Sequence, residues 1–162
     1  MTGLGRGSLY GAFGDKHTIF VRALDEYSTA TMAAVRAELR DSTESAYDRL
    51  VGHIRSMARA NATDSKRRGC LTAKSAAELA ATDKAVARRV KRFLDAYQTE
   101  LTETIAAAQR EGDLDGAVDS RDLAALVLTI VRGMEALRKA GASSATITSA
   151  SEQAVALLPG GA

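Results

Sequence analysis

Apolar residues recur at steps of three and four along most of this 162-residue chain, which is the spacing of one face of an α-helix. The longest such stripe starts at Val86 and continues through Phe93, Leu101 and Ala108. No segment shows the alternation of polar and apolar residues that indicates a β-strand. The pattern predicts an all-α fold with helices at about 15–40, 41–62, 72–81, 83–111, 120–140 and 144–158.

Residues that favour helix ends lie at the borders of these segments. Asp15 and Asp83 can each accept hydrogen bonds from the first free N–H groups of a helix. The run Asp-Ser-Thr-Glu at 41–44 has the composition of a capping box and predicts the start of the second helix. Gly112 and Gly141 are placed to end the two long helices that precede them.

The composition supports helix packing and gives no sign of a membrane segment. Hydrophobic residues make up 46% of the chain but aromatic residues only 4%, so the apolar mass is mostly Ala, Leu and Val. A formal net charge of +2 is too small to indicate nucleic-acid binding by itself. No apolar run approaches the length of a membrane span, and the N-terminus lacks the apolar region of a signal peptide. We expect a cytoplasmic protein with no membrane partner.

One segment near the N-terminus carries a specific motif. Residues 5–16 read Gly-Arg-Gly-Ser-Leu-Tyr-Gly-Ala-Phe-Gly-Asp-Lys. This run resembles the recognition helix, and the turn that follows it, of TetR-family transcriptional regulators. In that family a small hydroxyl residue, Leu-Tyr, an aromatic residue and a Lys close the helix-turn-helix, which here are Ser8, Leu9-Tyr10, Phe13 and Lys16.

The resemblance implies a TetR-like helical bundle with a partial helix-turn-helix at its N-terminus. Residues 1–16 would be the remnant of the DNA-binding domain, and residues 17–162 the ligand-binding and dimerisation domain. The two helices that precede the recognition helix in the family are not found in this sequence. We therefore expect a truncated DNA-binding domain, and Leu9 and Phe13 would lack the helices on which they pack.

Operator DNA is the partner that this motif implies, because the N-terminal part of a recognition helix meets base edges in the major groove. Arg6 is suited to a guanine edge or a phosphate, whereas Tyr10 and Lys16 are suited to phosphate oxygens. A glycine-rich N-terminus without a function is the alternative. The expected DNA-contacting residues are Arg6, Gly7, Ser8, Tyr10, Gly11, Ala12 and Lys16.

The two long middle helices carry larger and polar-tipped side chains in an otherwise Ala-rich chain. Such groups are typical of small-molecule cavities, although ordinary core packing explains each of them as well. The family resemblance adds that a regulatory ligand normally binds between these helices. The expected ligand-binding residues are Tyr47, His53, Met57, Phe93 and Tyr97.

The candidates for reactive chemistry are few. The run Gly69-Cys70-Leu71 resembles a motif in one branch of the family, but Lys74 stands where a polar residue, often Asn, is usual. A redox role for Cys70 is conceivable beside the basic residues 66–68, although most lone cysteines are inert. His17 and His53 are not in a metal-ligand spacing, and no nucleophile elbow or nucleotide-binding loop is present. The sequence predicts no enzyme activity, no metal site and no cofactor.

The last two predicted helices share an apolar face that is broader than one neighbouring helix can cover. In the family this pair of helices meets its symmetry mate in a four-helix bundle, which implies a homodimer. Burial inside the single chain is the alternative. The expected interface residues are Leu126, Val127, Ile130, Val131, Met134, Leu137, Ile147 and Val155.

These features together predict a dimeric, ligand-responsive, TetR-like regulator that acts as a repressor. In the mechanism that the resemblance implies, a ligand tilts the helix that begins near Asp15 and changes the separation of the two recognition helices. The alternative is a dimeric small-molecule-binding module that no longer binds DNA because the first two helices are absent.

Overall fold

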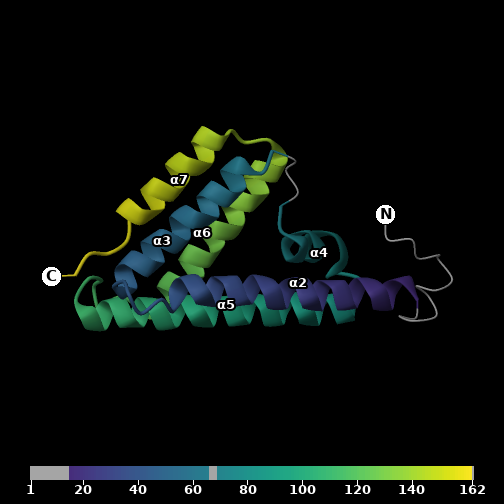
Figure 1. Cartoon of the computed structure of the whole chain (residues 1–162), viewed down its shortest axis with the longest axis horizontal. Coiled ribbons are helices and arrows are strands. Elements are labelled where there is room, and N and C mark those ends of the chain that lie inside the picture. The colour runs from purple at the N-terminus through teal and green to yellow at the C-terminus, as the bar shows by residue number, and fades with distance from the viewer. Residues whose placement is uncertain (1–14, 66–68, 162) are drawn as a thin grey trace.

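The computed structural model describes residues 15–65 and 69–161, and in these ranges the chain is all-α (Figure 1). The strand-like element of these ranges is an isolated bridge between Leu114 and Gly160. This confirms the predicted fold class. The helices are α2 (Lys16–Leu39), α3 (Ala46–Thr63), α4 (Leu71–Leu79), α5 (Lys84–Glu111), α6 (Ser120–Ala140) and α7 (Ser144–Ala156).

Most helix ends are the ones that the sequence predicts. The Asp15 carboxylate accepts a hydrogen bond from the Thr18 N–H at 2.8 Å, and that of Asp83 accepts from the N–H groups of two residues at the start of α5. Gly112 and Gly141 adopt φ values of 88° and 110°, which favour glycine, and they end α5 and α6.

The predicted capping box at 41–44 is wrong. Helix α3 begins at Ala46, and its cap is Ser45, whose hydroxyl accepts from the Asp48 N–H at 3.1 Å. Asp41 instead closes a local turn, because its carboxylate accepts from the Thr43 N–H at 2.9 Å. A short acidic side chain serves a turn as well as a helix cap, so composition alone did not separate the two.

Helices α2 and α5 run parallel along the long axis of the molecule (Figure 1). Cross-helix pairs join His17 to Asp83, Arg89 to Asp25 and Arg36 to Glu100, with sequence separations of 66, 64 and 64. A nearly constant separation means that both helices advance in the same direction. Helix α2 is thereby tied to α5 at both of its ends.

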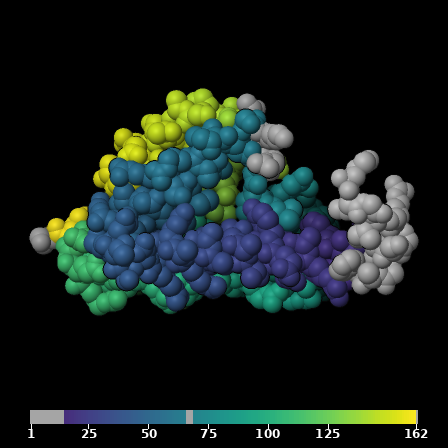
Figure 2. Space-filling model, viewed as in Figure 1, coloured from purple at the N-terminus to yellow at the C-terminus, as the bar shows by residue number. Residues whose placement is uncertain are grey.

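Helices α3, α6 and α7 stand obliquely on the α2–α5 pair, and the main core lies between these layers (Figure 1). Leu50, Ile54 and Leu101 are among its fully buried side chains. A smaller apolar cluster of Leu24, Val86 and Val90 lies near α4. Figure 2 shows a recess between α3 and α4 in which part of α6 is seen.

Within the described ranges no helix combines the length and the apolar content that a membrane crossing requires. The same ranges hold no group of three or more His, Cys, Asp or Glu side chains placed to bind a metal ion.

Candidate functional site

A hydrogen-bonded relay of three side chains crosses the molecule, and its members His53 and Tyr97 are buried. His53 of α3 is buried, and its Nε2 lies 2.5 Å from the hydroxyl oxygen of Tyr97 on α5. Its Nδ1 lies 2.6 Å from Oε2 of Glu38 on α2. In the neutral tautomer with the proton on Nδ1, His53 donates to Glu38 and accepts from Tyr97. The relay therefore joins three helices through a single imidazole.

The pKa values of the two ends of the relay are shifted in opposite directions. The hydrogen bond from His53 holds the pKa of Glu38 below its usual range, and the Ser56 hydroxyl, which donates to Oε1 at 2.9 Å, contributes. Burial raises the pKa of Tyr97 well above its usual value, although the nearby Arg132 opposes the shift. Tyr97 thus keeps its hydroxyl proton, and in this tautomer of His53 its O–H donates the hydrogen bond to Nε2.

Helix α6 places a second group of polar side chains against the same tyrosine. The guanidinium carbon of Arg132 lies 5.1 Å from the ring centre of Tyr97 and 5.9 Å from that of Phe93, within the range of a cation–π contact. Its Nη1 donates to Sγ of Cys70 at 3.6 Å and lies 3.1 Å from Oε2 of Glu135. Burial raises the pKa of Glu135, and the Arg132 charge opposes this.

Three of the five residues expected to bind ligand lie together in this cluster. His53 is bonded to Tyr97, and the rings of Phe93 and Tyr97 meet edge to face with their centres 5.9 Å apart. Tyr47 and Met57 are half-buried and pack against the main core, and within the described residues no hydrogen bond or ring contact joins them to the cluster. The five side chains therefore do not form one continuous group in the described part of the chain.

Sequence reasoning missed Glu38, Arg132 and Glu135. A signal was available for two of them, because Arg132 and Glu135 are charged residues inside the apolar stripe of α6, between Val127 and Leu137. Charged side chains are almost never fully buried unless they are paired, so charges in a core stripe mark a site. Glu38 had no such signal, because it is half-exposed at the end of α2.

Cys70 immediately precedes α4 and is buried. Its sulfur accepts the long hydrogen bond from Arg132, and burial together with this thiol raises the pKa of Tyr27 on α2. The described part of the chain gives no further support to the redox hypothesis. The thiol is part of the polar cluster and lies at the junction of α2, α4 and α6.

A different buried carboxylate fixes the C-terminal end of α2. Glu100 of α5 accepts from Nε of Arg36 at 2.8 Å and from Nε and Nη2 of Arg40 at 2.7 and 3.0 Å. Burial opposes ionisation of Glu100, but these hydrogen bonds outweigh it and hold its pKa below the usual range. We refer to Glu100, Arg36 and Arg40 as the Glu100 clamp.

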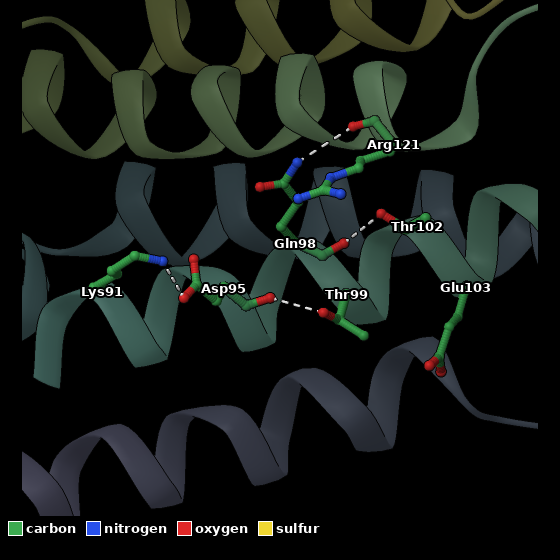
Figure 3. Close-up of a pocket in the computed structure, with 7 residues that line it drawn as sticks. All are labelled: Lys91, Asp95, Gln98, Thr99, Thr102, Glu103 and Arg121. Carbon is green, nitrogen blue, oxygen red and sulfur yellow. Dashed lines mark hydrogen bonds and ion pairs between the residues drawn. The ribbon is translucent and has the colours of Figure 1, made fainter. Parts of the chain in front are cut away.

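A polar hollow on the surface of α5 is a poor candidate for a ligand site (Figure 3). The Thr99 and Thr102 hydroxyls donate to carbonyls of their own helix, and the Lys91 ammonium pairs with Asp95 at 2.6 Å. Gln98 reaches across to the backbone carbonyl of Arg121 at the start of α6. Most polar groups that line this hollow already have hydrogen-bond or ion-pair partners within the chain, so few are left to bind a ligand.

The expected interface residues fall into two groups. Val127, Val131, Met134 and Ile147 are buried in the core of the single chain, and of these four only Val127 also lines the groove described below. These four residues therefore fit the alternative to a dimer interface, which is burial inside the single chain. The others remain accessible. Leu126 and Leu137 are exposed, and Ile130 and Val155 are half-buried.

The accessible apolar residues continue into a groove between α3, α6 and α7. Leu126 and Ile130 line it together with Ile54, Leu157 and Leu158. Among the described residues, Leu157, just after α7, is the most exposed large apolar side chain, with 79% of its surface accessible. An apolar face of this kind is typical of a contact with another protein surface.

The residues expected to contact DNA lie mostly outside the described residues. Arg6, Gly7, Ser8, Tyr10, Gly11 and Ala12 precede residue 15, so their positions stay a prediction. Lys16 is the first residue of α2 and is exposed. It is followed by His17, whose Nε2 lies 2.6 Å from Oδ2 of Asp83.

Comparison with known proteins identifies relatives of this architecture. A family model described as "Tetracyclin repressor-like, C-terminal domain" matches residues 46–154, which is more than half of the chain. A search of curated protein sequences found no significant match.

Solved structures share the fold at low sequence identity. The reduced form of Escherichia coli NemR superposes with a TM-score of 0.86 at 16% identity, covering 98% of this chain and 82% of that one. A TetR-family regulator from Agrobacterium tumefaciens gives 0.84 at 18% identity, covering 97% and 82%. Another from Cytophaga hutchinsonii gives 0.82 at 17% identity, covering 98% and 80%.

Proposed function

This chain belongs to the TetR family of transcriptional regulators, and we propose that it is a ligand-responsive repressor of the cytoplasm. It binds operator DNA through a helix-turn-helix whose recognition helix is in residues 5–16, and a small molecule releases it. Residues 17–162 are the ligand-binding and dimerisation domain. The observation that supports the ligand-binding part is the polar cluster of His53, Tyr97 and Arg132, buried where α3, α5 and α6 meet.

In the proposed mechanism, α2 is the lever between the ligand and the DNA. A 24-residue helix is about 36 Å long, so a tilt of about 5° moves its far end by about 3 Å. The Glu100 clamp and the Glu38–His53 contact hold the C-terminal end of α2, which makes that end the pivot. A ligand that displaces Tyr97 moves His53 and Glu38 with it, and the N-terminal end of α2 swings when its His17–Asp83 and Asp25–Arg89 contacts with α5 separate.

We further propose that the active form is a homodimer. Its interface uses the accessible apolar face of Leu126, Ile130, Leu137, Val155 and Leu157. A stable interface of this kind buries at least about 1,000 Å² in total. Leu126→Asp should give a monomer in analytical ultracentrifugation, whereas Thr129→Asp, an exposed polar position on the same helix, is the control.

The experiment that tests the regulator is operator selection followed by effector release. Duplexes that bind the protein are enriched from a random pool, and gel shifts with the enriched sequence are repeated in the presence of a small-molecule library. Half-sites should be separated by about 34–36 Å or a multiple of it. Lys16→Ala should weaken binding to all duplexes alike and reduce the salt slope by about one.

The outcomes of this experiment separate the two functions under consideration. Enrichment of a palindrome that a library compound releases supports the repressor. If no duplex is enriched but library compounds raise the melting temperature of the protein, the result would instead support the ligand-binding module that no longer binds DNA.

A further inference from the structure

The polar cluster contains two buried atoms whose hydrogen-bonding capacity is unused. Within the described residues, Nε of Arg132 and Oε2 of Glu135 have no hydrogen-bond partner and are shielded from solvent. The side chains are only 17% and 8% exposed. Nη1 of Arg132 lies 3.1 Å from Oε2 of Glu135, but the two are not aligned for a hydrogen bond.

Buried groups in this condition need an explanation. A buried donor or acceptor without a partner costs about 1–3 kcal/mol, and native proteins hold few of them. Here a donor and an acceptor lie three residues apart on the same helix, so one molecule that both accepts and donates can satisfy the two together. That complementarity suggests a specific occupant.

The neighbouring side chains fix the geometry of the donor. The guanidinium of Arg132 lies over the rings of Tyr97 and Phe93, and its Nη1 is held by Sγ of Cys70 at 3.6 Å. Its Nε edge is left for another partner. The buried rings of Tyr97 and Phe93 make the surroundings of the guanidinium apolar.

The charge of the pair restricts the ligand further. Arg132 and ionised Glu135 compensate each other, so an anionic ligand would be repelled by Glu135 and a cationic one by Arg132. An uncharged group meets neither penalty. A carboxamide-type edge, as in an amide, urea or lactam, carries a carbonyl acceptor beside an N–H donor.

We propose that Arg132 and Glu135 bind an uncharged effector with an apolar body and a carboxamide-type edge, whose carbonyl accepts from Nε of Arg132 and whose N–H donates to Oε2 of Glu135. This rests on the proposed function, since it names the chemical class of the effector. The recess between α3 and α4, in which α6 is seen, gives such a molecule a route toward that helix (Figure 2).

Three probes of the same shape and different charge test this assignment: benzamide, benzoate and benzamidine. Their dissociation constants are measured on the full chain by NMR titration, which resolves weak binding. Benzamide should bind at least about tenfold more tightly than either ion, which corresponds to about 1.4 kcal/mol. Comparable binding of all three would overturn the assignment.

Charge-changing variants locate the site. In Glu135→Gln the local charge becomes positive, so benzoate should gain at least about tenfold relative to benzamide. In Arg132→Gln it becomes negative, and benzamidine should gain instead. The second variant keeps the test decisive if the first does not fold. Glu100→Gln removes a buried carboxylate in another part of the molecule and should leave the order of the three probes unchanged.

The failure of this assignment is distinguishable from failure of the proposed function. No binding by any probe, or an order of affinities unchanged in both α6 variants, would overturn the carboxamide site. The operator selection and library release test the regulator independently. If a library compound releases the operator but the Arg132 and Glu135 variants leave the order of probe affinities unchanged, the protein is a repressor whose effector binds elsewhere.

Discussion

Two buried glutamates in this molecule have opposite environments. Glu100 is 5% exposed and accepts three hydrogen bonds from Arg36 and Arg40, so its pKa is held below the usual range. Glu135 is 8% exposed and has one cationic neighbour, Arg132, that is not aligned for a hydrogen bond with its Oε2. Burial therefore raises its pKa.

The difference separates a structural role from a binding role. A buried charge is tolerated when hydrogen bonds replace the water that it lost, and Glu100 meets this condition within the chain. Glu135 meets it only in part, and the missing partner is the opening for a ligand. The two residues are buried to a similar extent. They differ in how many of their carboxylate oxygens accept hydrogen bonds.

The largest effect is expected at the Glu100 clamp. Glu100→Ala should lower the free energy of unfolding by about 3 kcal/mol, because charge-assisted hydrogen bonds between α2 and α5 are lost. Urea denaturation at pH 7 measures the change. The control is Glu103→Ala on the same helix, which removes an exposed partner of Arg40 and should cost no more than about 1 kcal/mol. Equal losses in the two variants would contradict the structural role of Glu100.

The second largest loss in the free energy of unfolding is expected in the relay of Glu38, His53 and Tyr97. Tyr97→Phe removes the hydroxyl that satisfies Nε2 of buried His53, and should lower the free energy of unfolding by about 1–2 kcal/mol. Tyr47→Phe is the matched control, since Tyr47 is half-buried and its hydroxyl forms no hydrogen bond with the described residues. A double-mutant cycle of Tyr97→Phe with His53→Gln should show coupling between the two sites. Additive losses would show that the relay carries no coupling energy.

Glu135→Gln should change the free energy of unfolding at pH 7 by less than about 1 kcal/mol. The variant loses the attraction to Arg132 but no longer has a carboxylate whose burial is poorly compensated. Chemical denaturation beside Glu100→Gln gives the comparison directly. If Glu135→Gln is the more destabilised of the two, the hydrogen bonds of Glu100 are not what separates these sites.

The same two variants should respond to pH in opposite directions. Because the folded pKa of Glu100 is lowered, its contribution is present above the usual glutamate value of 4.5 and is lost as the pH falls through the folded pKa. The folded pKa of Glu135 is raised, so the wild type loses stability relative to Glu135→Gln as the pH rises above 4.5. Denaturation curves recorded on both sides of the ordinary glutamate value of 4.5 measure the differences. Parallel curves would contradict the contrast.

The sequence predicted the fold well and the site only in part. The helices could be predicted because their signals are local. These signals are the helical periodicity, the caps Asp15 and Asp83, and the glycines Gly112 and Gly141 that end α5 and α6. The contrast between Glu100 and Glu135 could not be predicted, since Glu100 is satisfied by two arginines of another helix whereas the arginine beside Glu135 is on its own helix and is not aligned with Oε2. The buried part of the α6 stripe was assigned to an interface because periodicity gives the apolar face and not what covers it.

The smallest effect is expected for an ion pair whose two side chains are mostly exposed. Lys91 and Asp95 lie one turn apart on α5, with their charged atoms 2.6 Å apart and side chains 75% and 58% exposed (Figure 3). Lys91→Ala should change the free energy of unfolding by less than about 0.5 kcal/mol, because water solvates both charges and salt screens them. The effect should vanish in about 1 M salt, where the screening length is about 3 Å. A shorter contact than any in the Glu100 clamp would then contribute the least, which would show that enclosure and hydrogen-bond satisfaction decide the energies of the charges in this molecule. A loss comparable with that of Glu100→Ala would instead make the charge separation the deciding quantity.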